Sequence, residues 1–387
     1  MNILIHDYAG HPFAYDLSLE LAKKKKNRIY HFFFKNDVGP KGYSIRKKNL
    51  EVVPISIRNY KKKNLFSRFF LDFVYGFKFI SKLSTIDCNV VISNAPINTQ
   101  FLIYIYCKLT NKKFIFWLQD IYFISVKYLI KNKFFNLIIL NFFKIIEKNI
   151  LRNSDYIIVN SKSFKDTLKK YNIFNKNISI IENWPPKIIS SKIPKINNWS
   201  KKLTKNNKKK IFYTGTLALK HNPKLIYELA KKSEKDFDFY IFSSGTGFED
   251  LKTLQKKNNL NNLKLKPLVS IKKYPKVLAS ADFFLGTINS YSREFAIPSK
   301  IYSYIAAKRP IIFISSAQNT QAKLIKRYGL GITISINYRI NDISKIIKKF
   351  STNASLHKKT LINQIKYEKQ NFRIDRIAKK FRKIINT

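Results

Sequence analysis

Cysteine is nearly absent from this chain of 387 residues, which contains only Cys88 and Cys107. Two thiols cannot build a disulfide framework or a four-cysteine zinc site, and such sparing use fits a reducing compartment. Histidine is also scarce, at five residues, and no H-E-x-x-H pattern occurs. No metal site is therefore expected. The chain also lacks a P-loop and a G-x-S-x-G elbow, which argues against the enzyme classes built on those motifs.

Acidic residues are few, with 23 Asp and Glu against 74 Lys and Arg, and the formal net charge is +51. Most of the basic residues are lysines, and we expect the majority to lie on solvated faces without a dedicated partner. The summed positive field still attracts anionic lipid headgroups and nucleic acid.

Long apolar runs are missing as well. A membrane span needs about 20 mostly apolar residues. The longest uncharged stretch, Cys88 to Cys107, contains Asn, Pro, Thr and Gln, and it is interpreted as a strand, a turn and a helix. The first residues, Met1 to Asp7, read as a first β-strand, and no secretion signal is predicted.

Short apolar runs alternate with longer amphipathic segments from end to end, which predicts an α/β protein with parallel sheets covered on both faces. Its length predicts two domains. We expect the first over 1–185, a linker rich in Pro, Asn, Ser and Lys over 186–210, the second over 211–365, and a C-terminal helix over 366–387. Helices are expected, among others, over 161–171 with Ser161 as N-cap, and over 223–232, 300–307 and 320–328.

The most informative segment is Tyr213-Thr-Gly-Thr-Leu-Ala-Leu-Lys-His-Asn-Pro223. It reads as the end of a strand, a turn at Gly215 and Thr216, the cation of Lys220 and the start of a helix. Glycine allows the backbone to approach an oxyanion closely, and a helix start offers N–H groups. The segment predicts a phosphate site, although a surface loop in a lysine-rich protein would look similar.

Three further features of the second half point to the same edge of a sheet. The segment around Gly245 is a second strand-to-helix turn, which either lines a nucleotide or only turns the chain. Glu294 precedes the Pro298-Ser299-Lys300 turn, where Ser299 is interpreted as an N-cap and Lys300 adds charge. Two phosphate-binding helix starts in one domain suggest a nucleotide-sugar site.

In the first half, Gly10 and His11 follow the first strand, and Asp120 follows a buried strand over 114–118. Ligands of open α/β sheets bind beyond the carboxyl ends of the strands. His11 is expected either to hydrogen-bond an acceptor or a diphosphate, or to be satisfied by the backbone of its loop. Asp120 either accepts a proton from an incoming hydroxyl or caps a turn.

Taken together, these residues resemble the family-4 glycosyltransferases of the GT-B fold, especially bacterial surface-polysaccharide transferases such as N-acetylfucosamine and colanic-acid transferases. The segments that carry the resemblance run in family order over nearly the whole chain. They are His6-Asp-Tyr-Ala-Gly-His-Pro-Phe13, Trp117-Leu-Gln-Asp-Ile121, Glu182-Asn-Trp184, the Tyr213–Pro223 segment and Pro298-Ser-Lys-Ile-Tyr-Ser-Tyr-Ile-Ala-Ala307.

The resemblance implies two Rossmann-like domains with parallel sheets facing a central cleft, and a C-terminal helix that crosses back to the first domain. It also implies retention of anomeric configuration, no metal ion and no cofactor beyond the nucleotide-sugar donor. Gly215, Thr216, Lys220, Gly245, Ser299 and Lys300 would hold the donor. Asp120, His11 and Glu294 would be catalytic, and Gly10 with His11 would meet the acceptor.

One departure concerns a pair of glutamates that many relatives carry before and within the last helix quoted. Phe295 and Ser303 hold those positions here, and Glu294 lies one residue early. Either Glu294 compensates or Ser299 takes over the ribose.

Two segments, 59–80 and 127–148, mix cations with many aromatic or aliphatic residues. They are either helices packed on the first sheet or helices lying at a bilayer interface, and one helix can do both. We therefore expect a UDP-sugar donor, a lipid-linked saccharide acceptor, and a cytoplasmic protein held peripherally at an anionic membrane. The alternatives are a basic nucleic-acid-binding protein, and a transferase of the same fold with a soluble or protein acceptor.

Overall fold

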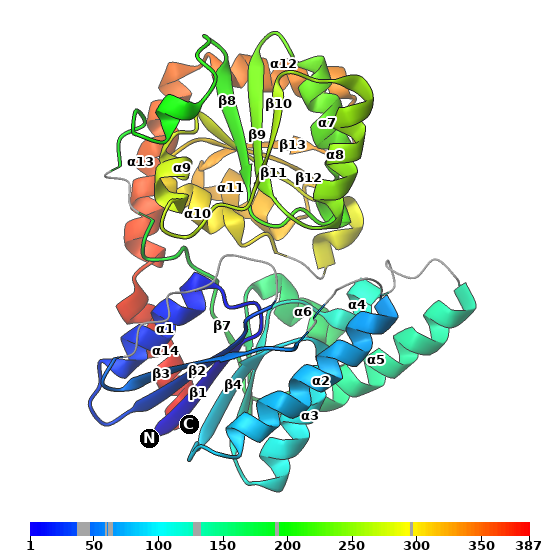
Figure 1. The fold of residues 1–387 in the computed structure, drawn as a ribbon, viewed down its shortest axis with the longest axis vertical. Coiled ribbons are helices and arrows are strands. Elements are labelled where there is room, and N and C mark those ends of the chain that lie inside the picture. Colours follow the sequence, from blue (N-terminus) through cyan, green and yellow to red (C-terminus); the bar gives the residue numbers. More distant parts are fainter. Residues whose placement is uncertain (37–46, 59, 61–64, 127–132, 190–192, 295–296) are drawn as a thin grey trace. The chain divides into compact units, whose positions relative to one another are not determined.

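The chain divides into two units in the computed structural model, which describes residues 1–36, 47–58, 60, 65–126, 133–189, 193–294 and 297–387 (Figure 1). Unit 1 contains Met1–Glu182, Glu294 and Ile374–Thr387, and unit 2 contains Asn183–Arg293 and Ile297–Arg373. In the described part of the chain, no helix combines the length and the apolar character that a bilayer span requires.

Unit 1 is built on a seven-stranded sheet in the order β3-β2-β1-β4-β5-β6-β7, and every neighbouring pair is parallel. Its central strands are almost wholly buried, as expected for a sheet covered on both faces. The strands are β1 (Asn2–Asp7), β2 (Arg28–Phe34), β3 (Leu50–Ile55), β4 (Val90–Asn94), β5 (Lys113–Leu118), β6 (Tyr156–Val159) and β7 (Ile178–Ile180).

The helices of unit 1 form two groups. Helices α2, α3, α4 and α5 pack on one another, and α1 packs on α14. Ser161 is the N-cap of α6, as predicted, and its hydroxyl accepts a hydrogen bond from Phe164 N at 3.2 Å. The helices are α1 (Pro12–Ala22), α2 (Leu65–Leu83), α3 (Ile97–Leu109), α4 (Tyr122–Val126), α5 (Lys133–Asn153), α6 (Lys162–Lys170) and α14 (Ile374–Asn386).

The last helix, α14, returns to the first unit, which confirms that part of the predicted fold. Phe381 lies edge-on to Trp117 with ring centroids 5.4 Å apart. Arg382 donates to the carbonyl of Glu20 at 3.2 Å. The helix that returns begins at Ile374, whereas the sequence placed its start at 366; residues 354–371 form a separate helix of unit 2.

Unit 2 repeats the design with six parallel strands in the order β10-β9-β8-β11-β12-β13. Helices α7, α8 and α12 pack together, as do α9, α10, α11 and α13. Its strands are β8 (Lys209–Thr214), β9 (Phe237–Ser243), β10 (Leu263–Pro267), β11 (Phe283–Thr287), β12 (Ile311–Ser315) and β13 (Gly331–Ser335).

The helices of unit 2 agree closely with those predicted, and α10 and α11 have the predicted bounds. They are α7 (Pro223–Lys232), α8 (Thr246–Asn258), α9 (Tyr274–Ala279), α10 (Lys300–Ala307), α11 (Thr320–Tyr328), α12 (Ile340–Ser351) and α13 (Ala354–Asn371). Unit 2 also has three short 3-10 turns, η1 (Ser200–Lys202), η2 (Leu219–His221) and η3 (Ser290–Glu294), of which the last residue, Glu294, is grouped with unit 1.

The segment 186–210, expected as a linker, folds against unit 2 where the structure describes it. The Trp199 ring lies edge-on to Phe212 and Phe242, with centroids 6.1 and 5.2 Å apart. Thr204 N donates to the hydroxyl of Tyr240 at 2.9 Å. Contacts of Trp199 and Thr204 therefore anchor a stretch whose composition indicates an open connection.

Both sheets start from a central strand, build outward to one side, and then continue on the other side. The reversal occurs between β1 and β4 in unit 1 and between β8 and β11 in unit 2. In doubly wound sheets, ligands bind beyond the carboxyl ends of the strands at this switch point. The loops that follow β1 and β8 are therefore where sites are expected.

Candidate functional site

The loop after β8 lies beside the loop after β9 in unit 2. Gly215 N donates to the carbonyl of Phe242 at 3.0 Å, and the Ser243 hydroxyl donates to Gly215 O at 2.7 Å. Gly215 has φ +95°, which a side chain would disfavour. The backbone therefore leaves the sheet at Gly215 in a sharp turn that only glycine adopts readily.

Gly245 allows these two loops to approach each other. Its φ is +106°, and a Cβ atom added to it would lie 3.0 Å from the carbonyl oxygen of Leu217. Leu217 N donates to Ser244 O at 2.9 Å across the same contact. Gly245 thus shapes the loop around Gly215, and this packing accounts for the glycine without a ligand.

Lys300, the first residue of α10, extends over this loop. Its Nζ atom lies 3.8 Å from the centre of the Tyr213 ring, donates to the Tyr213 hydroxyl, and donates to Thr216 O at 3.1 Å. A Cβ atom added to Gly215 would lie 3.7 Å from Lys300 Cε. Gly215, Thr216 and Lys300 therefore meet at one point, as the proposed phosphate site requires.

Tyr304 fixes the register between α10 and the end of β8. Its hydroxyl accepts a hydrogen bond from Thr214 N at 2.9 Å, and its ring stacks on Phe284 with centroids 4.1 Å apart. Tyr274 adds a hydrogen bond to the Thr214 hydroxyl at 3.0 Å. Because Tyr304 lies one turn after Lys300, the same contact holds the lysine over the loop. Sequence reasoning found no sign of this anchor beyond an apolar helix face.

Lys220 belongs to the same charged cluster. Its carbonyl accepts a hydrogen bond from Asn289 N at 2.8 Å, which ties turn η2 to the end of β11. Burial, and then the charge of Lys220, hold the pKa of Lys300 well below its usual range. Burial and both lysines also lower the pKa of His221, so this histidine is neutral and accepts a hydrogen bond from Ala218 N at 3.1 Å.

Ser299 is at the N-cap position of α10, as interpreted, but its side chain does not cap the helix. Ser299 has helical dihedrals, φ −61° and ψ −22°, and its side chain makes no capping hydrogen bond. Ile301 N and Tyr302 N instead donate to the carbonyls of Pro298 and Ser299, at 3.2 and 3.1 Å. The helix start thus satisfies these two N–H groups itself, and the charge of Lys300 becomes the main attraction for an anion. The Glu294 side chain, predicted to be catalytic, lies outside the described residues.

In unit 1, the loop after β1 brings Gly10 and His11 to the switch point. Gly10 has φ +67° and its N donates to Asp7 O at 2.9 Å. The Asp7 carboxylate accepts from His11 Nδ1 at 3.0 Å and from Asn94 Nδ2, at the end of β4, also at 3.0 Å. Sequence reasoning selected His11 and missed its partner Asp7, although the two stand four residues apart.

Asp120 follows β5 at the same edge of the sheet and is half-buried. The segment after it is held by Glu147 of α5, a fully buried carboxyl group that accepts from Tyr122 N at 3.1 Å and Phe123 N at 2.8 Å. Burial raises the pKa of Glu147 to about 8. Sequence reasoning missed this residue too, because a single glutamate on a basic helix has no distinguishing pattern.

Among the described residues, no cluster of His, Cys, Asp and Glu is arranged to hold a metal ion. The sequence does contain one Asp-x-Asp, Asp236 and Asp238, but it lies at the amino end of β9. Asp236 pairs with Lys348 at 2.8 Å, and Asp238 accepts from Asn206 at 2.9 Å. These aspartates are on the edge of the sheet opposite the Gly215 loop.

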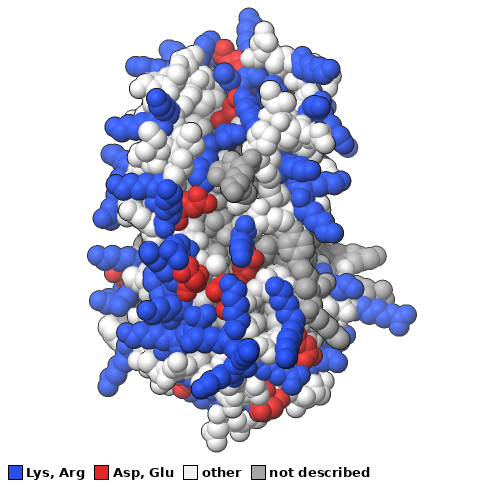
Figure 2. Space-filling model, turned by 90° about the vertical axis from the view of Figure 1, so that its left-hand side faces the viewer, with Lys and Arg blue, Asp and Glu red and all other residues white. Residues whose placement is uncertain are grey.

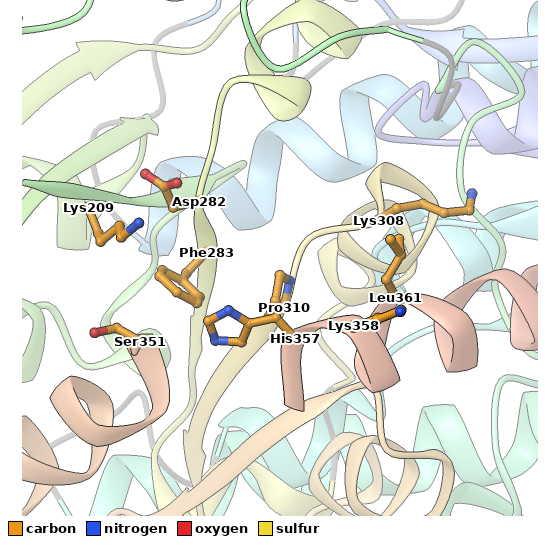
Figure 3. A pocket seen from close by; sticks show the side chains of 9 residues that line it. All are labelled: Lys209, Asp282, Phe283, Lys308, Pro310, Ser351, His357, Lys358 and Leu361. Atoms are coloured by element: carbon orange, nitrogen blue, oxygen red, sulfur yellow. The ribbon is translucent and has the colours of Figure 1, made fainter. Parts of the chain in front are cut away.

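A cavity of about 300 Å³ also lies at that opposite edge of unit 2, beside the starts of β8, β11 and β12 (Figure 3). Several of its polar side chains have partners in the protein. Lys308 pairs with Glu368, and His357 Nε2 donates to Phe350 O at 2.7 Å. The cavity is therefore separate from the Lys300 cluster. Its lining residues are Lys209, Asp282, Phe283, Lys308, Pro310, Ser351, His357, Lys358 and Leu361.

No protein-family model matches this sequence, and no curated protein matches it. Solved structures, however, match the whole chain. Sucrose-phosphate synthase from Thermosynechococcus elongatus has a TM-score of 0.77 at 11% identity, over 100% of this chain and 98% of that one. Anabaena HepE in complex with UDP and glucose has 0.71 at 12% identity, over 100% and 99%.

A third solved structure, WaaG, is a glycosyltransferase involved in lipopolysaccharide biosynthesis. It has a TM-score of 0.66 at 11% identity, over 98% of both chains. At such low identity these likenesses establish the fold alone. The chain has the GT-B fold with two parallel-sheet Rossmann-like domains, which confirms the predicted fold class.

Proposed function

We propose that this protein is a glycosyltransferase that takes its sugar from a nucleotide-sugar, most simply a UDP-sugar. The observation that carries the proposal is the meeting of Gly215, Thr216 and Lys300 at the switch point of unit 2. A glycine turn and a desolvated cation suit the diphosphate of such a donor. The GT-B fold supports this use of the second domain, and HepE, which shares the fold, was solved with UDP.

Thermal unfolding with and without nucleotide tests the donor site. A ligand present at 100 times its Kd stabilises the native state by about 2.7 kcal/mol. For a unit of this size, that corresponds to a rise in Tm of about 5–10 °C. We expect UDP to give this shift, GDP to give less, and Lys220→Ala or Lys300→Met to reduce it by about half or more. The exposed Lys231→Met in α7 is the matched control. If no nucleotide shifts the unaltered protein, the donor site is refuted.

The reaction we propose proceeds with retention and without a metal ion. Lys300 and Lys220 would offset the charge that develops on the leaving diphosphate, the role that a cation has in other transferases. Gly245 and Ser299 would line the donor, whereas Asp120, His11, Gly10 and Glu294 would act on the acceptor side. Anomeric proton NMR of the product and assays in EDTA test both points. An inverted product, or loss of activity in EDTA, would contradict them.

A lipid-linked saccharide is the acceptor we propose, and the surface of unit 1 supports it. Helix α2 buries Tyr75 and Phe79 in the core while Phe70 and Phe77 remain 66% and 62% exposed. Val74 of α2 is exposed as well, and so are apolar side chains of α3, which packs on α2, and of α5, which packs on α3. Those on α3 and α5 are Ile105, Leu109, Phe142 and Ile145. Parts of the two segments singled out earlier, 59, 61–64 and 127–132, lie outside the described residues.

Flotation with vesicles tests this membrane contact and the peripheral, cytoplasmic location proposed with it. We expect recruitment to vesicles containing anionic lipid and little to neutral ones, because lysines such as Lys78 and Lys144 lie on the same helices as the exposed apolar residues. The double variant Phe70→Ser/Phe77→Ser should weaken recruitment, whereas Ile362→Ser, an equally exposed residue of unit 2, should not. Equal recruitment of both variants would exclude α2 as the contact.

The bacterial polysaccharide pathway and an N-acetylated deoxy sugar as donor remain part of this proposal, and they rest on the sequence resemblance. The main alternative is a nucleic-acid-binding protein. Figure 2 shows Lys and Arg spread over the visible face rather than gathered in one stripe, which does not favour a dedicated nucleic-acid groove. Filter binding distinguishes the two. Tight, salt-sensitive binding of RNA or DNA that UDP does not affect would favour a nucleic-acid-binding protein. In a separate assay, transfer to a soluble sugar without vesicles would favour a transferase with a soluble acceptor.

A further inference from the structure

Glu147, on helix α5, is a fully buried glutamate in a chain with 74 Lys and Arg. The ion pairs of the described residues do not include it. Each of its two oxygens instead accepts one backbone N–H. Oε1 accepts from Tyr122 N at 3.1 Å, and Oε2 accepts from Phe123 N at 2.8 Å. A buried carboxyl group is unfavourable unless such hydrogen bonds satisfy it. Both oxygens of Glu147 therefore hold the segment that follows β5.

The two N–H groups that Glu147 accepts are the first two of α4, a helix of only five residues. The first N–H groups of a helix have no acceptor within the helix, and so short a helix is not stable alone. The bond that closes the first turn of α4 runs from Ser125 N to Ile121 O at 3.2 Å. Glu147 supplies the acceptors that the helix itself cannot offer to Tyr122 and Phe123. It therefore caps α4, which packs on α5 (Figure 1).

The segment between β5 and α4 is held at a second point. Asn160, which follows β6, donates from Nδ2 to Gln119 O at 3.2 Å. Asp120 and Ile121 lie between the two attachments, and Ile121 is fully buried whereas Asp120 is half-buried. Burial is the main cause that raises the pKa of Glu147 to about 8, and the charge of Asp120 adds to it, so the two carboxyl groups are close enough to interact. A segment attached on both sides keeps the Asp120 carboxylate in one place, as a preorganised site requires.

We propose that Glu147 is a positioning residue for sugar transfer, because by capping α4 it fixes the loop after β5 and with it the Asp120 carboxylate. This proposal rests on the transferase function proposed above, in which Asp120 would act on the acceptor side. It adds the residue that determines where that carboxylate lies, and it makes the geometry of the loop depend on α5. Glutamine has one acceptor oxygen and an amide group that donates, so Glu147→Gln can keep only one of the two hydrogen bonds.

Amide hydrogen exchange measured by NMR tests the cap without substrate. We expect the amides of Tyr122 and Phe123 to be protected in the unaltered chain, although the first N–H groups of so short a helix would otherwise exchange rapidly. Glu147→Gln should raise their exchange rates about tenfold. Asp155→Asn is the matched control and should leave both rates unchanged, because Asp155 also accepts a backbone N–H, from Phe114 at 2.8 Å, but at the opposite edge of the same sheet. Rapid exchange of both amides in the unaltered protein would overturn the cap, whether or not the variant folds.

Kinetics test whether Glu147 acts through Asp120. Glu147→Gln should lower kcat by about 10- to 100-fold, the effect expected when a catalytic group is displaced by about 1 Å. It should leave the KM for the donor and the UDP-induced rise in Tm unchanged, and Asp155→Asn should not alter kcat. Combined with Asp120→Asn, Glu147→Gln should lower kcat little further, because the carboxylate that it positions is already absent.

The outcomes separate this inference from the proposed function. If the unaltered protein transfers sugar and Glu147→Gln lowers kcat by the same factor with and without Asp120→Asn, or does not lower it at all, the positioning role is refuted while the transferase stands. If the unaltered protein transfers no sugar, the proposed function and the role of Glu147 in the reaction fail together. The exchange rates of Tyr122 and Phe123 then still decide whether Glu147 caps α4.

Discussion

Replacing Lys300 by methionine should separate ligand binding from stability. The ammonium group lies 3.8 Å from the centre of the Tyr213 ring, and burial together with Lys220 lowers its pKa. A diphosphate would supply the anionic partner that this cation needs. Hydrogen bonds to charged groups contribute about 1.5–3 kcal/mol, so the Kd for UDP should rise about 10- to 150-fold.

The same substitution should not destabilise the free protein. A lysine whose pKa is lowered by folding is harder to protonate in the folded chain than in the unfolded one. Its protonation therefore reduces the stability of the folded protein as pH falls. Methionine removes that cost and keeps the aliphatic packing on Tyr213. The Tyr213 hydroxyl retains its own hydrogen bond to Thr216 O at 3.0 Å. We therefore expect the Tm without ligand to stay the same or rise.

Calorimetry measures the Kd for UDP and the Tm without ligand, and it also detects protons taken up on binding. Because a bound diphosphate favours protonated Lys300, binding should take up protons, and the affinity should fall as pH rises through the lowered pKa. The uptake is seen as a dependence of the measured enthalpy on the ionisation enthalpy of the buffer. Lys220→Met should shift the decline in affinity to higher pH. A change in Kd below threefold for Lys300→Met, with no proton uptake when UDP binds the unaltered protein, would refute this description of the site.

Two further predictions concern stability. Gly245→Val should lower the free energy of unfolding of unit 2 by about 1–3 kcal/mol, because Gly245 has φ +106° and a new Cβ atom would lie 3.0 Å from Leu217 O. Urea unfolding measures this loss. An unchanged midpoint of unfolding would contradict the packing described. Burial lowers the pKa of His6 to about 3 and that of His31 to about 4. Each neutral ring therefore contributes stability that is complete above pH 6.5 and declines as pH falls, by about 3 kcal/mol at pH 4. Unit 1 should unfold more readily at pH 4.5 than at pH 7, and equal stability at both pH values would show that these rings are not neutral in the folded chain.

Local patterns of the sequence determine most of the fold. The helices at 300–307 and 320–328 have their predicted bounds because apolar periodicity and clear end signals agree there. The segment around Gly215 was recognised because strand, glycine and helix start lie within a few residues. Ser299 shows the limit of this reasoning, since a residue type that favours N-caps does not fix its own dihedral angles.

The contacts that build the site are long-range and were not predictable from pattern. Tyr304 and Thr214 are 90 residues apart in the sequence, and Lys300 and Tyr213 are separated by 87. Nothing near Tyr304 marks it as an anchor, because a tyrosine on an apolar helix face is usually a core residue. Asp7 was missed for a related reason, since the last residue of a buried strand gives no local sign that its carboxylate will meet a ring four residues later.

Lys300 can be distinguished from the many other lysines of this chain by what surrounds it. Lys308 is more deeply buried, with a side chain 6% exposed, but Glu368 of α13 pairs with it. Lys300 is desolvated and repelled by Lys220, and the ion pairs of the described residues do not include it. A half-buried cation that has no anion among the described residues destabilises the fold. In a chain with 74 Lys and Arg, the amine held in this unfavourable environment is therefore the one that an anionic ligand would stabilise most.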